Sequence, residues 1–210
     1  MTNEQSHIAT ILKRLKKRYP VVNTQLDHQT PFQLLTATIL SAQCTDVQVN
    51  RVTKDLFAQY PDAASLANAS MTEIKRLIFS TGFYNNKAKN IKACAQTLLE
   101  TYNGTVPEKI DELTRLPGVG RKTANVVRSV CFGHQTIVVD THVHRISRRL
   151  GLSDKKDPAK AEFELMAKLP QASWNDFSLQ LIYFGREICD ARKPLCDICF
   201  LYDICPTRGR

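Results

Sequence analysis

The chain has 210 residues, of which 43% are hydrophobic, and its Lys and Arg residues outnumber Asp and Glu by 29 to 20. This composition is that of a globular protein with a full core, in one large domain or two small ones, and it excludes a disordered chain. The net charge of +9 favours a polyanionic partner such as nucleic acid, although a solvated cationic surface has the same composition.

The first twenty residues indicate an amphipathic helix rather than a targeting segment. Ile8, Ile11, Leu12 and Leu15 recur at helical spacing, and no apolar core of a signal peptide is present. The most apolar stretch, residues 34–40, is far shorter than the roughly 18 residues that cross a membrane. We therefore expect an intracellular, cytoplasmic protein with no membrane contact.

Helical patterns continue along the rest of the chain. Thr30 and Pro31 are a typical N-cap and first helical residue, with a helix running on to Cys44, and Thr45 or Asp46 is a suitable cap for the next helix. Further helices are predicted at about 72–80, 86–101, 108–115, 121–132, 141–150, 158–168 and 174–188, with turns at 60–65, 102–104 and 116–120. The one strand-like run, residues 136–139, is too short to make a sheet, so the predicted fold class is all-α.

Four of the seven cysteines crowd into the C-terminal end as C-x6-C-x2-C-x5-C, and they are Cys189, Cys196, Cys199 and Cys205. Four thiolates in one short loop can surround a single metal centre with little loss of chain entropy. Disulfides are disfavoured in an intracellular chain. A [4Fe-4S] cluster and zinc are the alternatives, and the single C-x2-C pair with longer spacers favours the cluster, because zinc sites usually pair two such knuckles.

The first spacer of this loop carries two cations. Arg192 and Lys193 lie between the first and second cysteines, so a rigid loop would project both of them. A closed four-cysteine site near a chain end is expected to be structural, and these two residues are candidates for contact with phosphates.

The stretch "LPGVGRKTANVV", residues 116–127, predicts a helix-hairpin-helix. Gly118 and Gly120 bracket Val119 in a tight turn, and the helix that begins near Arg121 directs its free N–H groups toward that turn. Such a turn can hold a DNA phosphate without contacting bases. An ordinary helix–helix turn is the alternative.

Lys122 lies in the first turn of the second hairpin helix, where the helix dipole and the adjacent Arg121 disfavour a positive charge. Both effects favour the neutral amine, which is a nucleophile. From the residues alone, a nucleophile and a simple phosphate contact remain open for Lys122.

Asp140 ends an apolar run and begins a helix, which makes it a candidate N-cap. A carboxylate at this place could also stabilise positive charge on a sugar and take part in proton transfer. His142 and His144 follow two residues apart, a spacing that directs them to different sides of a helix, so we reject a metal site there.

Taken together, "LPGVGRKTANVV", "VDTHVHR", "ILSAQCTD", "TGFYNNKA" and the cysteine spacing resemble the endonuclease III family, the helix-hairpin-helix, iron–sulfur DNA glycosylases of base excision repair. The resemblance covers nearly the whole chain. It implies two helical domains with DNA and a flipped base in the cleft between them. Residues 24–134 would form a six-helix domain with the hairpin, and residues 1–23 plus 135–210 a discontinuous iron–sulfur cluster domain.

The resemblance also implies chemistry for two residues. By position, Lys122 matches the lysine that forms a Schiff base and Asp140 the catalytic aspartate. The implied activity removes oxidised pyrimidines and then cleaves the strand 3′ to the abasic site by β-elimination, with damaged or abasic double-stranded DNA as partner. The family also implies a [4Fe-4S] cluster and a monomer.

Two further positions match residues that enter the DNA duplex in this family. Gln43 resembles the residue that fills the gap left by the flipped base, although a polar residue at a helix end is its other interpretation. Phe83 stands where the family commonly has leucine, and its larger ring can still wedge between bases. Asp46 could line the pocket or cap its helix, and we leave it out of the catalytic set.

Two other functions remain to be weighed. Mismatch-specific adenine glycosylases have a similar hairpin, aspartate and four-cysteine loop, but typically lack a lysine at position 122 and carry an additional C-terminal domain. A non-catalytic helix-hairpin-helix module would explain the charge and the glycines, but it leaves Lys122 and Asp140 without a purpose.

Overall fold

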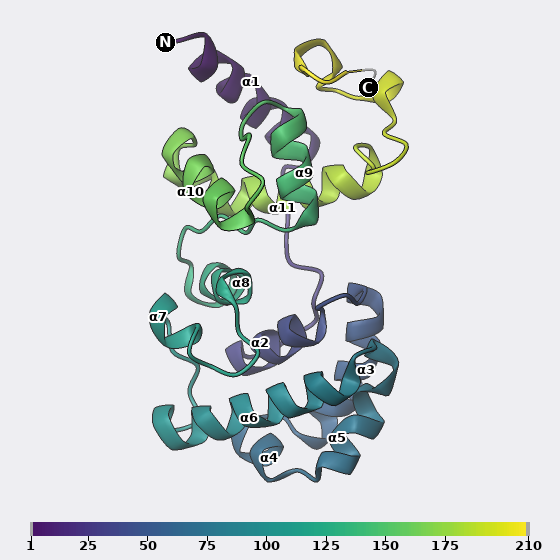
Figure 1. The fold of residues 1–210 in the computed structure, drawn as a ribbon, viewed down its shortest axis with the longest axis vertical. Helices are drawn as coiled ribbons and strands as arrows, with labels where there is room; N and C mark the ends of the chain where they lie inside the picture. Colours follow the sequence, from purple (N-terminus) through teal and green to yellow (C-terminus); the bar gives the residue numbers. More distant parts are fainter. Residues whose placement is uncertain (1, 209–210) are drawn as a thin grey trace. The chain divides into compact units, whose positions relative to one another are not determined.

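The chain folds into two units in the computed structural model, which describes residues 2–208 (Figure 1). Unit 1 combines the residues up to Asn23 with those from Gln135 onward, and unit 2 runs from Thr24 to His134. Each unit has its own hydrophobic core. All regular secondary structure in the described residues is helical, which confirms the all-α prediction, and residues 136–139 are irregular.

Unit 2 is built around two helices, α2 and α6. Its elements are α2 (Pro31–Leu40), α3 (Asp46–Gln59), α4 (Ala63–Asn68), α5 (Met71–Ile78), the 3-10 helix η1 (Phe79–Thr81), α6 (Tyr84–Tyr102), α7 (Ile110–Leu113) and α8 (Arg121–Phe132). Every residue of α2 from Phe32 to Leu40 is buried, as expected for a helix that is apolar on all sides. Helix α6 contacts α4, α5 and α2, and α8 packs on α2.

Unit 1 joins the two ends of the chain in one core. Its elements are α1 (Asn3–Arg18), α9 (Thr141–Arg149), α10 (Pro158–Lys168), η2 (Gln171–Ser173), α11 (Trp174–Glu187), η3 (Cys196–Ile198) and η4 (Tyr202–Ile204). Helix α11 packs against both α1 and α9 (Figure 1). The apolar face of α1 is buried at Ile8, Ile11 and Leu15, which confirms the amphipathic helix predicted there.

Part of the positive charge of the chain is used to hold α1 in place. Arg14 pairs with Asp203, Lys16 with Asp176 at 2.7 Å, and Arg18 with Glu187 at 2.9 Å. Such exposed pairs contribute little to stability. They nevertheless show that three of the basic residues of α1 have partners within the chain, so the net charge is not all directed at a polyanion.

The helix boundaries differ from the sequence-based expectations at four places. The prediction of a turn at 60–65 was wrong, because Asp62 and Ser65 form a reciprocal capping box that starts α4 at Ala63. Helix α2 ends at Leu40 rather than Cys44, α5 ends at Ile78 and gives way to η1, and α7 has only the four residues Ile110–Leu113. Of the two caps proposed for α3, Thr45 is the one used.

Among residues 2–208, no helix combines the length and the apolar character that a membrane-spanning segment requires.

The burial of α6 predicts a sharp difference between two adjacent leucines. Leu98 is fully buried in unit 2, whereas Leu99 is 39% exposed. Leu98→Ala should lower the free energy of unfolding by about 2–5 kcal/mol through lost contacts and a cavity. Leu99→Ala makes the same chemical change at the surface and should cost under about 1 kcal/mol. Urea denaturation followed by circular dichroism measures both, and equal losses would contradict the packing described for α6.

Candidate functional site

The turn between α7 and α8 has one glycine that the backbone requires. Gly118 has a φ of +77°, in the left-handed region, and a Cβ placed there would lie 2.8 Å from Cβ of Asn90 on α6. Val119 is buried and its N–H donates to the carbonyl of Leu116, so the turn is anchored to the core at its centre. Both the backbone angle and the closeness of α6 therefore restrict position 118 to glycine.

Gly120 is a glycine for a different reason. Its φ of −91° is available to any residue, and a Cβ placed on it would meet nothing within 4 Å. It is the N-cap of α8, and it makes no side-chain cap hydrogen bond. An exposed helix start of this kind suits an anionic group, because free N–H groups and the helix dipole both attract negative charge.

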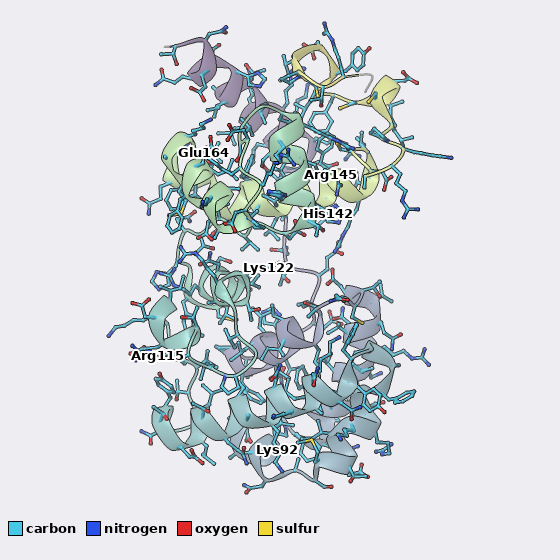
Figure 2. The ribbon with its side chains drawn as sticks, viewed as in Figure 1. Lys92, Arg115, Lys122, His142, Arg145 and Glu164 are labelled. Atoms are coloured by element: carbon cyan, nitrogen blue, oxygen red, sulfur yellow. The ribbon has the colours of Figure 1, made fainter. Side chains whose placement is uncertain are left out.

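Lys122 is exposed in the first turn of α8, one residue after Arg121, which is half-buried (Figure 2). The hairpin turn therefore presents a primary amine close to the helix start that suits an anion. Lys122 belongs to unit 2, and Asp140 belongs to unit 1.

Asp140 is the N-cap of α9. Its Oδ1 accepts a hydrogen bond of 2.8 Å from the N–H of Val143, which confirms the capping role predicted from the sequence. The residue is half-buried. Because the cap uses one carboxylate oxygen and the group carries two, capping does not exclude a chemical role.

The two histidines after Asp140 have separate structural contacts. His142 accepts a hydrogen bond of 3.1 Å from Nη2 of Arg145, and burial lowers the pKa of its imidazole (Figure 2). His144 lies 2.9 Å from the carbonyl of Lys155. The separation of the two rings into different environments agrees with the rejection of a metal site there.

Gln43 and Phe83 share an unusual backbone. Their φ angles are +53° and +49°, and the third non-glycine residue with a positive φ among residues 2–208 is Asn103. Asparagine adopts this conformation readily at a helix end, but glutamine and phenylalanine do not. Both side chains are exposed, Phe83 at 66%, so each sits at the tip of a strained turn. Two of the residues selected from the sequence for contact with DNA, Gln43 and Phe83, thus have a strained backbone conformation.

The four C-terminal cysteines surround one cavity in unit 1. Cys189 follows α11, Cys196 begins η3, and Cys199 and Cys205 follow η3 and η4. All four are half-buried free thiols. The wall of the cavity is completed mainly by apolar side chains, among them Leu150, Phe184, Ile188, Pro194, Leu195 and Leu201.

These residues fit an iron–sulfur cluster. Burial is the largest effect that raises the pKa of the Cys199 thiol, and the other three cysteines add to it. Two N–H groups point at sulfur, from Leu201 to Cys199 at 3.4 Å and from Arg149 to Cys189 at 3.2 Å. Within the described part of the chain, no three His, Cys, Asp or Glu side chains are arranged to hold a single metal ion. Four thiols at the edges of a mainly apolar cavity provide the donor set of a cluster, which needs its ligands at the corners of a cage.

Two arginines that the sequence did not single out support this loop. Nη1 and Nη2 of Arg149 donate to the carbonyls of Asp190 and Ala191 at 2.6 and 2.9 Å, and Arg145 donates to the carbonyl of Cys189 at 2.9 Å. Both arginines lie on α9, about 40 residues before the loop, so no local pattern could have revealed these contacts.

The loop that carries Arg192 and Lys193 is closed by Asp190. Oδ1 of Asp190 accepts hydrogen bonds from the backbone N–H groups of Arg192 and Lys193 at 2.8 and 3.0 Å. These bonds lower the pKa of the Asp190 carboxyl to about 2. The side chains of Arg192 and Lys193 are exposed, so a rigid backbone presents two cations to solvent.

Comparison with known proteins agrees with both parts of the site. Residues 36–171 match the model of the HhH-GPD superfamily of base excision DNA repair proteins, and residues 189–205 match the iron–sulfur binding domain of endonuclease III. Endonuclease III of Synechocystis sp. is 51% identical over 208 residues, which is 99% of this chain and 95% of that protein. The chain belongs to the endonuclease III family.

Solved structures of this family have the same fold. A non-covalent endonuclease III–DNA complex matches with a TM-score of 0.93 at 43% identity, covering 99% of this chain and 97% of that chain. A trapped endonuclease III–DNA covalent intermediate matches with a TM-score of 0.93 at 44% identity and the same coverage. As a member of the endonuclease III family, the protein is a bifunctional DNA glycosylase and AP lyase with a [4Fe-4S] cluster, and its partner is double-stranded DNA. Neither the zinc alternative nor a non-catalytic module is supported.

The two hairpin glycines should respond differently to substitution by alanine. Gly118→Ala should lower the stability of the protein by about 1–3 kcal/mol, because alanine would have to adopt a positive φ and displace Asn90. Gly120→Ala should fold normally, since its backbone and surroundings accept a methyl group. Thermal unfolding compares the two variants. A larger loss for Gly120→Ala would show that the turn has another geometry.

Proposed function

We propose that Lys122 is the nucleophile of the glycosylase and lyase reactions and that Asp140 assists departure of the base. The observation that carries the proposal is the exposed amine of Lys122 in the first turn of α8, directly after a turn whose glycines leave the helix start open. The amine would thus be held where a DNA phosphate is also bound, which orients the sugar for attack.

The reaction follows from this placement of the amine. The target nucleotide must leave the base stack, because its C1′ cannot be reached inside a duplex. The neutral amine of Lys122 attacks C1′ as the bond from C1′ to the base breaks, and the departing base takes up a proton. The attached nitrogen then loses a proton, the bond from C1′ to the ring oxygen O4′ breaks, and the opened sugar is left as a protonated Schiff base. The Schiff base makes the C2′ proton acidic, and loss of that proton expels the 3′ phosphate by β-elimination.

Asp140 would act through its charge. Positive charge develops on the sugar as the base departs, and a carboxylate stabilises it. The hydrogen bond from Val143 fixes the orientation of the carboxylate, so the cap of α9 would position the group for chemistry.

The remaining contacts with DNA follow the hairpin, the cysteine loop and the two positions of strained backbone. We propose that Gly118, Val119, Gly120 and Arg121 hold the DNA backbone in the hairpin turn, and that Arg192 and Lys193 contact phosphates from the cysteine loop. Gln43 and Phe83 would enter the space vacated by the flipped base. In this scheme, residues 24–134 supply the hairpin, and residues 1–23 with 135–210 supply the cluster domain.

The cluster would be held by Cys189, Cys196, Cys199 and Cys205. When bound, it supplies a rigid structural centre that ties the short helices η3 and η4 and the Arg192/Lys193 loop together. Arg149 and Arg145 hold the same loop from α9, and Asp190 fixes its backbone.

We further propose oxidised pyrimidines as the substrates, with the enzyme acting as a monomer on DNA in the cytoplasm, at the nucleoid. A lysine at position 122 distinguishes this proposal from a mismatch adenine glycosylase, which typically lacks it.

Borohydride trapping tests the role of Lys122. The wild-type protein should form a covalent adduct with a duplex containing an abasic site or thymine glycol, and Lys122→Gln should form none, because borohydride links protein to DNA only by reducing a Schiff base between them. Lys160, which is exposed in the first turn of α10, provides the matched control, and Lys160→Gln should trap normally. Absence of a wild-type adduct on either duplex would overturn the lyase assignment, and an adduct with Lys122→Gln would place the nucleophile elsewhere.

The substitution Asp140→Asn removes the negative charge of residue 140 and keeps its ability to cap α9. Asparagine caps helices as well as aspartate does, so α9 and DNA binding should persist while removal of the base slows by about 100-fold or more. Asp157 caps α10 through the same kind of bond, to the N–H of Lys160 at 2.9 Å, and Asp157→Asn should leave the rate unchanged. Single-turnover kinetics and DNA-binding titrations measure the two effects. If Asp140→Asn kept the full rate, Asp140 would be a cap alone.

A further inference from the structure

Lys87 is a buried lysine that the proposed reaction does not use. It lies in the first turns of α6, its residue surface is only 5% exposed, and its Nζ donates a hydrogen bond of 2.8 Å to the backbone carbonyl of Thr81. Burial lowers the pKa of this amine. A buried ammonium is costly unless its hydrogen bonds are satisfied, so an aliphatic side chain would suit stability as well or better.

The carbonyl that Lys87 holds belongs to the segment just before Phe83. Thr81 is itself 2% exposed, and its hydroxyl donates to the carbonyl of Ile78 at 2.8 Å. Gly82 and Phe83 follow with φ angles of +69° and +49°. The backbone therefore enters its strained conformation immediately after the residue that Lys87 fixes.

The other side of the Phe83 turn is also tied to α6. The carbonyl of Phe83 accepts hydrogen bonds from the N–H groups of Asn86 and Lys87, both at 3.1 Å. Lys87 thus makes hydrogen bonds on both sides of the turn. Its backbone N–H donates to the carbonyl of Phe83, and its side chain donates to the carbonyl of Thr81.

We propose that Lys87 is a positioning residue for Phe83, holding the Thr81–Phe83 segment in the conformation in which the exposed ring can enter the DNA duplex. This inference rests on the proposed role of Phe83. A strained turn persists only where its surroundings determine it fully, and the bond from Lys87 to Thr81 supplies that constraint. Its loss would let the turn relax and withdraw the ring, so Lys87 would act on the choice of opposite base through Phe83 rather than on the chemistry at C1′.

Lys92 provides a matched control on the same helix. Its Nζ donates to the carbonyl of Ala69 at 2.6 Å, between α4 and α5, so it makes the same kind of bond to a different turn (Figure 2). Lys87→Met and Lys92→Met each remove one amine-to-carbonyl bond from α6. A purely structural role for Lys87 predicts that neither variant alters the response to DNA, whatever its effect on stability.

The test is a double-mutant cycle in which the rate of base removal is compared for each base opposite the lesion. Single-turnover removal of thymine glycol is measured with A, G, C or T opposite the lesion, in the wild type, Lys87→Met, Phe83→Ala, the double variant and Lys92→Met. We expect Lys87→Met and Phe83→Ala to slow base removal by about 10-fold or more and to change the ranking of opposite bases alike. The double variant should match Phe83→Ala alone, and Lys92→Met should keep the wild-type ranking.

The outcomes separate this inference from the proposed function. Additive effects of Lys87→Met and Phe83→Ala, or an unchanged ranking in Lys87→Met, would overturn the positioning role while wild-type borohydride trapping still upheld Lys122 as the nucleophile. Failure of the wild type to trap would instead overturn the proposed function. If Lys87→Met does not fold, Lys87→Arg gives the same cycle, because arginine keeps a charged donor but changes its length and geometry.

Discussion

The packing of α6 is the constraint on which the candidate DNA-contacting turns of unit 2 depend. This helix of 19 residues is buried against α4, α5 and α2. Its first residue follows Phe83, its Lys87 holds the carbonyl of Thr81, and its Asn90 excludes any side chain at Gly118. Phe83, the proposed wedge residue, and the hairpin glycine Gly118 are 35 positions apart in the chain, and the conformations of both depend on the same helix.

Helix α9 has a comparable place in unit 1. Asp140 caps its beginning, and Arg145 and Arg149 on its later turns hold the loop that starts at Cys189. The helix also packs tightly on α11, where a Cβ at Gly185 would lie 2.5 Å from Nδ1 of His142. The proposed catalytic carboxylate and the support of the cluster loop are thus parts of one rigid element, which limits how far either can move independently of the other.

Several residues in this protein serve the fold and the proposed chemistry at once. Asp140 is both an N-cap and the proposed catalytic carboxylate. In the same way, the positive charge that favours DNA is partly used in ion pairs that hold α1, through Arg14, Lys16 and Arg18. The composition gives only the total positive charge. The contacts show which of the cations hold the fold together and which remain at the surface.

The amino-acid sequence by itself determined the helical class, most of the helices, the cysteine loop and the hairpin, because these depend on periodicity, capping and spacing over a few neighbouring positions. The roles of Lys122, Asp140, Gln43 and Phe83 came from the resemblance of the sequence to the endonuclease III family. It missed α4, whose start depends on the reciprocal bonds of Asp62 and Ser65, and it extended α2 beyond Leu40. Only the tertiary structure decided that Gly118 is required by Asn90 while Gly120 is not, and that Gln43 and Phe83 are strained. It also decided that Lys87 bonds to the turn before Phe83 and that Arg149 bonds to the cysteine loop. The physical reason is that steric exclusion, backbone strain and side-chain hydrogen bonds join residues that folding brings together, and for Gly118 and Arg149 those partners lie tens of positions away in the chain.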